Sequence, residues 1–134
     1  MIRIRVRNKE RGFTLIEMII VVAIIAILLG IAIPVYNIHL LHAREAVLRT
    51  DLASIRDAIG QFTQDKQRAP QSLDDVVSAG YLRALPKDPF THAADWQAVQ
   101  EDVLSSLDQT QPGITDVHSS SNQISSEGTA YSSW

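Results

Sequence analysis

The sequence predicts an α+β protein in which a long N-terminal helix carries a small C-terminal head. Three observations predict this fold. The residues from 18 to 33 are almost purely aliphatic and follow a basic N-terminus. An amphipathic helical pattern continues beyond this run, and from Asn37 onward the composition is that of an ordinary soluble domain. Such a break in composition indicates a membrane element joined to a water-soluble domain. We expect the head to contain a short helix and a small antiparallel sheet.

Residues 1–12 form a basic leader. They carry a single acidic residue, Glu10, whereas the whole chain has a net charge of −3. The basic residues are Arg3, Arg5, Arg7, Lys9 and Arg11. Basic residues beside an apolar segment stay in the cytoplasm, so the rest of the chain is expected to face outward. A nucleic-acid arm is the alternative for such a leader. The adjoining aliphatic segment would lie in lipid, so no nucleic acid is expected as a partner.

Residues 13–36 have the length and composition of a transmembrane helix. No charged residue occurs in residues 18–43. About 20 predominantly apolar residues are enough for a helix to span a bilayer. A secretory signal peptide also combines a basic start with an apolar core. The acidic Glu17 at the start of this run argues against that alternative.

A second helical pattern follows the apolar run. Its apolar residues recur every three or four positions and form one stripe on a helix, namely Leu48, Leu52, Ile55, Ile59 and Phe62. We expect one helix from about Phe13 to about Asp65, and residues 37–66 as the amphipathic helix of the head. Pro34 removes a backbone donor inside this helix and Gly30 adds flexibility one turn earlier, so the helix should be weakened or kinked there.

The head, residues 67–134, should begin with a short helix. Ser72 is typical of an N-cap, because Asp75 follows three residues later and completes a capping box. The helix is expected to extend to Ser78. Gly80 then fits its C-terminal stop, since glycine adopts the left-handed conformation that ends many helices.

Two later segments are strand candidates. In the first, from Trp96 to Leu104, alternating residues favour a strand, but Val99 and Val103 break the alternation. The second candidate is Ile114 to His118, which a Pro-Gly pair precedes. Together these segments account for the expected sheet.

The last segment, residues 119–134, allows two interpretations. Its richness in serine is typical of disorder. Tyr131 and Trp134 near its end favour packing against the head instead, because exposed aromatic side chains would leave a large apolar surface in water. We expect the segment to pack.

The histidines and serines do not indicate an enzyme. His39 and His42 are three residues apart, just beyond the apolar run, where polar residues are expected. Ser, His and Asp also occur together between Asp116 and Ser121. A catalytic triad needs residues brought together from separate parts of the fold around an oxyanion site. The sequence contains no Gly-rich phosphate loop, so no catalytic residue is expected.

The leader meets the apolar run in the sequence Lys9-Glu10-Arg11-Gly12-Phe13-Thr14-Leu15-Ile16-Glu17. A basic leader, a glycine, a phenylalanine and then Thr-Leu-Ile-Glu opening an apolar helix resemble the prepilin signal of the type IV pilin superfamily. The resemblance implies the pilin fold. It also implies that prepilin peptidase cuts between Gly12 and Phe13 and that the new amine of Phe13 is N-methylated.

Glu17 is the notable residue of this motif. A carboxylate at the edge of a bilayer is costly and usually has a partner and a function. The alternative is that it lies hydrated among lipid headgroups. The resemblance implies that it pairs with the N-terminal amine of a neighbouring subunit during assembly. It also implies that residues 13–36 form the filament core and that the helix loosens between Gly30 and Pro34.

The rest of the chain resembles the major pseudopilin of type II secretion systems. The similar features are Leu73 to Leu82, Leu85-Pro86-Lys87-Asp88-Pro89-Phe90, Ile114 to Ser119, Glu127-Gly128-Thr129 and Trp134. The resemblance implies a structural subunit of a piston-like pseudopilus that drives protein export across the outer membrane. A type IV pilus subunit for adhesion, motility or DNA uptake is the alternative, and a tethered binding module that never polymerises is a third.

The same resemblance implies partners and a location. The partners are other copies of the chain, minor pseudopilins, prepilin peptidase, the inner-membrane assembly platform and lipid. The chain is expected to cross the bacterial inner membrane once, with a cytoplasmic N-terminus and a periplasmic head. After assembly it would lie in a periplasmic or cell-surface filament.

Major pseudopilins bind calcium in the C-terminal loop, and here the sequence departs from them. Calcium needs six to eight oxygen ligands, several of them anionic. The residues from 128 to 134 contain no Asp. The remaining oxygen donors are Asp116, Ser119, Ser121, Asn122 and Glu127. The sequence therefore leaves calcium open as a cofactor and indicates no other. Without cysteine, the chain has neither disulfides nor Cys/His metal spacing.

Overall fold

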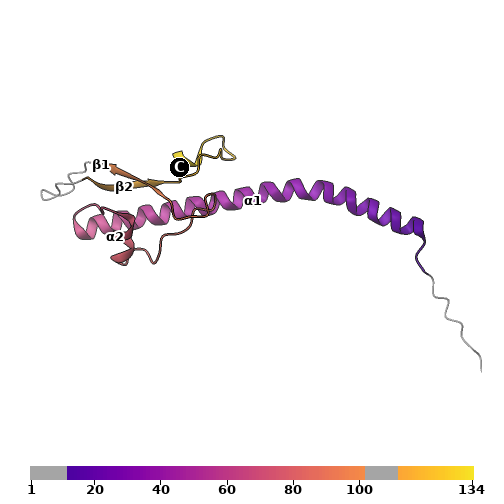
Figure 1. Ribbon diagram of the computed structural model, residues 1–134, viewed down its shortest axis with the longest axis horizontal. Helices are drawn as coiled ribbons and strands as arrows, with labels where there is room; N and C mark the ends of the chain where they lie inside the picture. Colours follow the sequence, from indigo (N-terminus) through magenta and orange to yellow (C-terminus); the bar gives the residue numbers. More distant parts are fainter. Residues whose placement is uncertain (1–11, 102–111) are drawn as a thin grey trace, which may run out of the picture. The chain divides into compact units, whose positions relative to one another are not determined.

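The computed structural model describes residues 12–101 and 112–134, and the chain divides into two compact units after Ile38. The second unit, residues 39–134, is called the head below. The elements are α1 (Leu15–Lys66), α2 (Leu73–Ser78), β1 (Gln97–Glu101), β2 (Gly113–His118) and a short 3₁₀ helix, η1 (Tyr131–Ser133), as labelled for the helices and strands in Figure 1. A long helix followed by a short helix and a two-stranded sheet confirms the expected α+β pilin fold.

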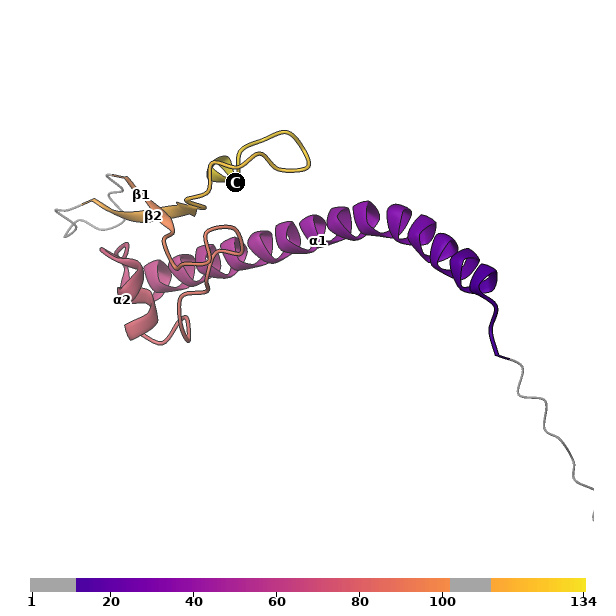
Figure 2. The same cartoon turned by 45° about the vertical axis from the view of Figure 1, so that its right-hand side comes forward.

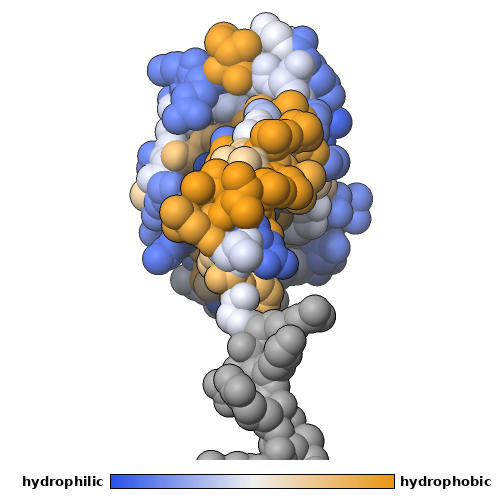
Figure 3. All heavy atoms as spheres, turned by 90° about the vertical axis from the view of Figure 1, so that its right-hand side faces the viewer, coloured by the Kyte–Doolittle hydropathy of each residue, from blue (hydrophilic) through white to orange (hydrophobic). Residues whose placement is uncertain are grey.

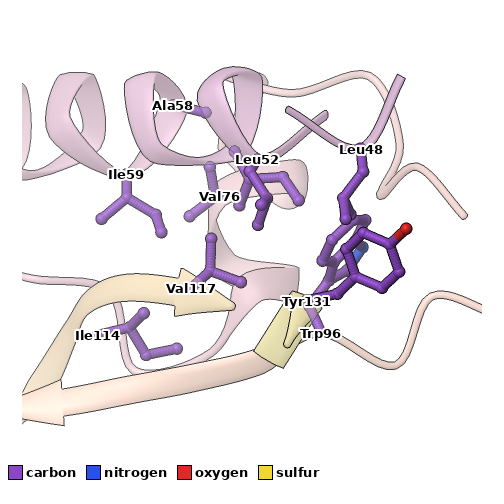
Figure 4. Packing of buried hydrophobic residues seen from close by; sticks show 10 residues of the cluster. Leu48, Leu52, Ala58, Ile59, Val76, Trp96, Ile114, Val117 and Tyr131 are labelled. Atoms are coloured by element: carbon purple, nitrogen blue, oxygen red, sulfur yellow. The ribbon is translucent and has the colours of Figure 1, made fainter. Parts of the chain in front are cut away.

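Within the head, α1 buries the predicted apolar stripe. All five of its members are buried: Leu48, Leu52, Ile55, Ile59 and Phe62. In Figure 4 several of these side chains point toward Val117 of β2 and toward Tyr131. The core is completed from α2 and from the loop before β1, by Val76 and Trp96. The head therefore has one core, built on the inner row of α1.

The helix α2 has the predicted caps at both ends. The Ser72 hydroxyl accepts the Asp75 N–H at 3.2 Å, and the Asp75 carboxylate accepts the Ser72 N–H at 3.0 Å. At the other end Gly80 has φ +86°, and the Tyr81 N–H donates to the Val76 carbonyl at 3.2 Å. This is the Schellman arrangement, which satisfies carbonyls that a helix end leaves without partners.

The two strands form an antiparallel pair with a bulge. Gln97 lies opposite His118, and the register shifts between Val99 and Gln100. Only Val99 of β1 is even half-buried. Because β1 hardly contributes to the core, its sequence is free of the alternation that a half-buried strand needs. The part of the predicted strand beyond Glu101 lies outside the described residues.

The loop between α2 and β1 is organised by Asp88, which is fully buried. Its carboxylate accepts the Phe90 N–H at 2.8 Å and also the hydroxyl of Ser119, just after β2. Trp96 donates its indole N–H to the Pro86 carbonyl at 2.8 Å. Buried carboxylates need such partners, so this loop and the end of β2 hold each other in place.

Residues 119–134, called the C-terminal loop below, pack on the head as expected. The Tyr131 side chain is only 1% exposed and stacks on Phe90 with 3.9 Å between ring centroids. Trp134 meets Tyr131 edge to face, and an isolated bridge joins Ile124 to Ala130. Figures 1 and 2 both show the loop, in yellow, beside the part of α1 that belongs to the head. The aromatic residues, and not the serine content, therefore predicted its behaviour correctly.

Candidate functional site

The apolar segment, residues 13–36, leaves its large side chains exposed in the single chain. Every residue of the segment is exposed, with Phe13 at 79% and Ile24 at 52%. By length and composition α1 is able to cross a membrane, and none of its most apolar stretch is buried. Figure 3 shows apolar side chains, in orange, on the outer surface of the molecule. A helix that is apolar all round must be covered by lipid or by other protein.

The predicted cleavage site lies just before α1. Gly12, Phe13 and Thr14 adopt no regular secondary structure and are exposed. The Thr14 hydroxyl accepts the N–H of Glu17 at 3.3 Å and so caps the helix. A bond in an exposed, non-helical stretch is open to a protease. The leader itself, residues 1–11, lies outside the described residues.

Glu17 lies in the first turn of α1 and is exposed. Its negative charge is favourable there, because the N-terminal end of a helix carries partial positive charge. The structure therefore brings Glu17, Thr14 and Phe13 together at the same helix end. The pairing of Glu17 with another subunit stays a prediction.

Gly30 and Pro34 are both incorporated in α1, whose helical assignment continues through them. A methyl group built on Gly30 would meet no atom within 4 Å. The backbone therefore does not need glycine there for space within a single chain. The proposed loosening between these residues during assembly stays a prediction.

A second group of polar residues lies in the head, on one side of α1. Glu45, only 6% exposed, accepts the Ser126 N–H at 2.7 Å, the Ser126 hydroxyl at 2.6 Å and the Tyr131 hydroxyl at 2.9 Å. Burial alone would raise the pKa of Glu45, but these hydrogen bonds and the attraction of His42 outweigh it and lower the pKa below its ordinary value. Burial and the bond to Glu45 raise the pKa of Tyr131 to about 12. We call Glu45, Ser126 and Tyr131 the Glu45 cluster.

Two arginines of α1 make further contacts with the C-terminal end of the chain. Arg49 pairs with Glu127 at 2.5 Å and lies over the Trp134 ring, 4.3 Å from its centroid. Arg56 donates to Asp116 at 2.6 Å and to the main-chain oxygen of Trp134 at 2.7 Å. These contacts hold β2 and the C-terminal end of the chain against α1.

The residues from Asp116 to Ser121 are not arranged as a Ser-His-Asp triad. His118 directs Nδ1 to the main-chain oxygen of Trp134 at 2.6 Å, and its Nε2 lies 3.8 Å from the Asp116 carboxylate. The Ser119 hydroxyl donates to Asp88 on another loop. Each polar group therefore helps to hold the chain in place.

Comparison with known proteins agrees with this geometry. The family model described as the prokaryotic N-terminal methylation motif matches residues 7–33. The type II secretion system core protein G of Klebsiella michiganensis is 28% identical over an alignment of 132 residues, which covers 82% of this chain and 92% of the relative. The chain thus carries the N-terminal methylation motif and is similar over most of its length to type II secretion pseudopilins.

Two more relatives resemble this pilin-like chain to similar degrees. The core protein G of Klebsiella pneumoniae is 27% identical, with 87% of this chain and 94% of the relative covered. The fimbrial protein of Moraxella nonliquefaciens is 34% identical, with 66% of this chain and 61% of the relative covered. No solved structure matches the chain significantly.

The oxygen donors of this pilin-like chain do not fit a calcium site. Asp116 Oδ1 accepts from Arg56 and from the Val117 N–H, and Glu127 pairs with Arg49. Ser121 Oγ accepts the N–H of Gln123. Within residues 12–101 and 112–134, no three His, Cys, Asp or Glu side chains are grouped so that they could hold a metal ion. Calcium needs more anionic oxygens than these, and the nearby guanidinium groups would repel it.

The sequence interpretation missed Glu45. Its signal was available, because Glu45 lies three residues before Leu48 and continues the buried stripe toward the N-terminus. An acidic residue on an otherwise apolar face is buried when the helix packs, and it then needs hydrogen-bond donors. The donors, Ser126 and Tyr131, lie 81 and 86 residues away and could not be read from local sequence.

Proposed function

We propose that the chain is a structural subunit of a type II secretion pseudopilus, a piston-like filament that drives protein export across the outer membrane. The observation that carries this proposal is the exposed apolar segment, which directly follows an exposed Gly12–Phe13 bond. The similarity to core protein G, which extends through the head, favours the secretion branch. The role is structural, and no residue is assigned a catalytic part.

Processing prepares the subunit for assembly. Prepilin peptidase removes residues 1–12 on the cytoplasmic side, and glycine at the cut allows the backbone to enter a protease cleft without a side chain. Cleavage creates a positively charged amine at Phe13, which is then methylated. The mature chain therefore carries a cation and an anion, Phe13 and Glu17, within one turn of each other in sequence.

Glu17 selects the partner. In lipid its carboxylate lacks a strong donor, and a charge in such surroundings strongly favours an opposite charge. The Phe13 amine of a neighbouring copy supplies that charge when the two helices are staggered along the filament. The pair fixes the relative position of the two subunits, whereas the aliphatic side chains around it supply most of the attraction.

Apolar burial drives the exchange of lipid for protein. Before assembly, residues 13–36 lie in the inner membrane. In the filament they form a core of side-by-side helices, in which burial stabilises by about 25 cal/mol per Å² of apolar surface. Gly30 and Pro34 allow the helix to adjust locally as it packs.

The basic leader orients the subunit, with the N-terminus in the cytoplasm and the head, including residues 67–134, in the periplasm. Residues 37–66 connect the membrane part to the core of the head. In that orientation the inner-membrane assembly platform receives the subunit, and minor pseudopilins join the filament made from its copies.

Replacing Glu17 tests the assembly mechanism. We expect Glu17→Ala to insert into the membrane and to be processed, but to form no filament when it replaces the wild type. Asp57→Asn is the matched control, because it removes an exposed carboxylate from α1 in the head. Fractionation measures insertion, and electron microscopy of sheared material measures filaments. Normal filaments from Glu17→Ala would overturn the pairing.

The cleavage site has its own test. N-terminal sequencing of the mature protein should read Phe-Thr-Leu-Ile-Glu. Gly12→Val should keep the leader, whereas Gly30→Ala should be cut normally, because it lies outside the cleavage motif. A mature start at Met1 in cells that contain the peptidase would contradict the proposal.

A type IV pilus subunit is the second candidate, because a fimbrial protein is 34% identical over 66% of the chain. Deletion of the gene separates the two functions. Loss of exported proteins from the medium with unchanged surface fibres and twitching supports the pseudopilus. Loss of fibres or twitching with normal export supports the pilus.

A further inference from the structure

The C-terminal loop is well packed although it contains few charged residues. Within residues 119–134 the only acidic residue is Glu127, which is exposed. Nevertheless Ser119, Ser121, Ser125 and Tyr131 are buried. No buried side-chain nitrogen or oxygen in the described parts of the chain lacks a hydrogen-bond partner. The buried hydroxyl groups of this loop therefore have hydrogen-bond partners, and these partners hold the loop in place.

One attachment of the loop to α1 is anionic. Both oxygens of Glu45 are used: Oε1 accepts the Ser126 N–H and the Tyr131 hydroxyl, and Oε2 accepts the Ser126 hydroxyl. Hydrogen bonds to an ionised carboxylate are about twice as strong as neutral ones. Bonds to two points of the loop, five residues apart, fix its conformation as well as its position.

The arginine contacts described above extend the attachment along the same row of α1. Arg49 and Arg56 follow Glu45 by four and eleven residues, positions that fall on one side of a helix. Arg49 contacts Glu127 and Trp134, and Arg56 holds the main-chain oxygen of Trp134. In this row the charges that face the loop are one anion and two cations, a pattern that leaves no place for a divalent cation.

We propose that the Glu45 cluster fastens the C-terminal loop to α1 in place of calcium, so that the head acquires its folded loop without a divalent cation. In a calcium-binding loop, carboxylates of the loop converge on an ion. Here the direction is reversed, since donors of the loop converge on a carboxylate of the helix. The proposal concerns the head alone and stands whether the filament serves export or adhesion.

The test uses the full chain in detergent. Hydrogen exchange of the C-terminal loop and thermal unfolding, followed by tryptophan fluorescence, are measured in calcium chloride and in excess EGTA. For the wild type we expect the same unfolding midpoint and the same loop protection in both. Glu45→Gln should speed exchange in the loop about tenfold, and added calcium should not restore protection. Glu127→Gln, which changes an exposed acid of the same loop, should have a smaller effect.

Two further variants keep the test decisive if Glu45→Gln does not fold. Ser126→Ala and Tyr131→Phe each remove one hydroxyl donor and leave the carboxylate in place. Each is expected to speed loop exchange less than Glu45→Gln does, and equally with and without calcium. A wild-type midpoint that rises in calcium would overturn the proposal. So would loop protection that is unchanged in all three variants.

Discussion

Within the head, α1 buries five large apolar side chains in one row, whereas in residues 13–36 of the same helix no side chain is buried. In the head the chain itself covers the row, with Val76, Trp96, Val117 and Tyr131. In the apolar segment the aliphatic residues surround the helix, and none of residues 12–101 and 112–134 covers them. The difference indicates where stability comes from: from the fold in one part, and from lipid or from other copies in the other.

The two parts also differ in the use of a carboxylate. Glu45 is buried and receives three hydrogen bonds from its own chain. Glu17 is exposed at the start of the helix. A glutamate that the fold satisfies contributes to the stability of the head. A glutamate that the fold leaves exposed in an apolar surface is suited to recognise a separate molecule.

The largest expected effect comes from the buried row. Leu52→Ala should lower the free energy of unfolding of the head by about 3 kcal/mol, because it removes buried methyl groups and leaves a cavity. Both tryptophans, Trp96 and Trp134, lie in the head, so their fluorescence during denaturation of the full chain in detergent reports this unfolding.

Ile24→Ala is the matched control in the other part of the helix. Its side chain is 52% exposed, and its loss should leave the unfolding of the head unchanged. A loss of stability in the Ile24 variant as large as that in the Leu52 variant would break the distinction between the two parts.

Local patterns predicted most of the fold. The apolar stripe identified the five large apolar residues that α1 buries, because residues that recur every three or four positions lie on one side of a helix. It did not include Glu45 and Ala58, which are buried as well. Both ends of α2 could also be predicted, because their signals are local in sequence. These signals are the capping box of Ser72 and Asp75 and the left-handed Gly80. The bulge between Val99 and Gln100 could not be predicted, since it depends on how β1 pairs with β2 and not on the sequence of β1 alone.

A smaller effect is expected from acid, and it should act on the head through Glu45. Because the folded pKa of Glu45 is lowered, its ionised form stabilises the head above the pKa of the unfolded chain, and this contribution is lost as pH falls through the folded pKa. The groups that face Glu45 are Ser126, Tyr131 and His42. The unfolding midpoint of the wild type should therefore fall in acid more steeply than that of Glu45→Gln.

The pH dependence of the unfolding midpoint should be reduced in Glu45→Gln but not abolished. Burial would raise the pKa of Asp116, but bonds from the Val117 N–H and from Arg56 lower it, so Asp116 contributes with the same sign. Glu17→Gln makes the same chemical change outside the head and should keep the wild-type profile. Identical profiles for the wild type and Glu45→Gln would show that Glu45 does not carry the effect.

The smallest effect on the stability of the head is expected from replacing a glycine of α1. Gly60 lies in the interior of α1 with no atom within 4 Å of an added methyl group. Gly60→Ala should stabilise the head by about 0.5–1 kcal/mol, because alanine loses less backbone entropy in a helix. Denaturant titration of the full chain measures this change.

Two other glycines provide controls for Gly60→Ala. Gly30→Ala is equally free of clashes but lies in the apolar segment, so it should not change the unfolding of the head. Gly80 has φ +86°, a conformation that costs alanine about 1 kcal/mol, so Gly80→Ala should destabilise the head. Stabilisation by both Gly60→Ala and Gly80→Ala would contradict this conformational argument.

Only part of the candidate site could be inferred from the sequence. Gly12, Phe13 and Glu17 could be proposed because the prepilin-like motif is continuous in sequence, and their roles stay predictions. Glu45 and its donors could not be matched, because serines and tyrosines are common and only the folded chain shows which of them meet the carboxylate. A charge that interrupts an apolar stripe is the one local sign that such donors exist.

The hydrogen bond between Glu45 and Tyr131 joins residues that are 86 positions apart. Because the chain is made from its N-terminus, Glu45 is synthesised long before Tyr131. Until then the carboxylate and the neighbouring end of the core remain open to water. Completion of the head is therefore a late event of chain synthesis, and a chain whose synthesis stops before Tyr131 lacks this closing contact.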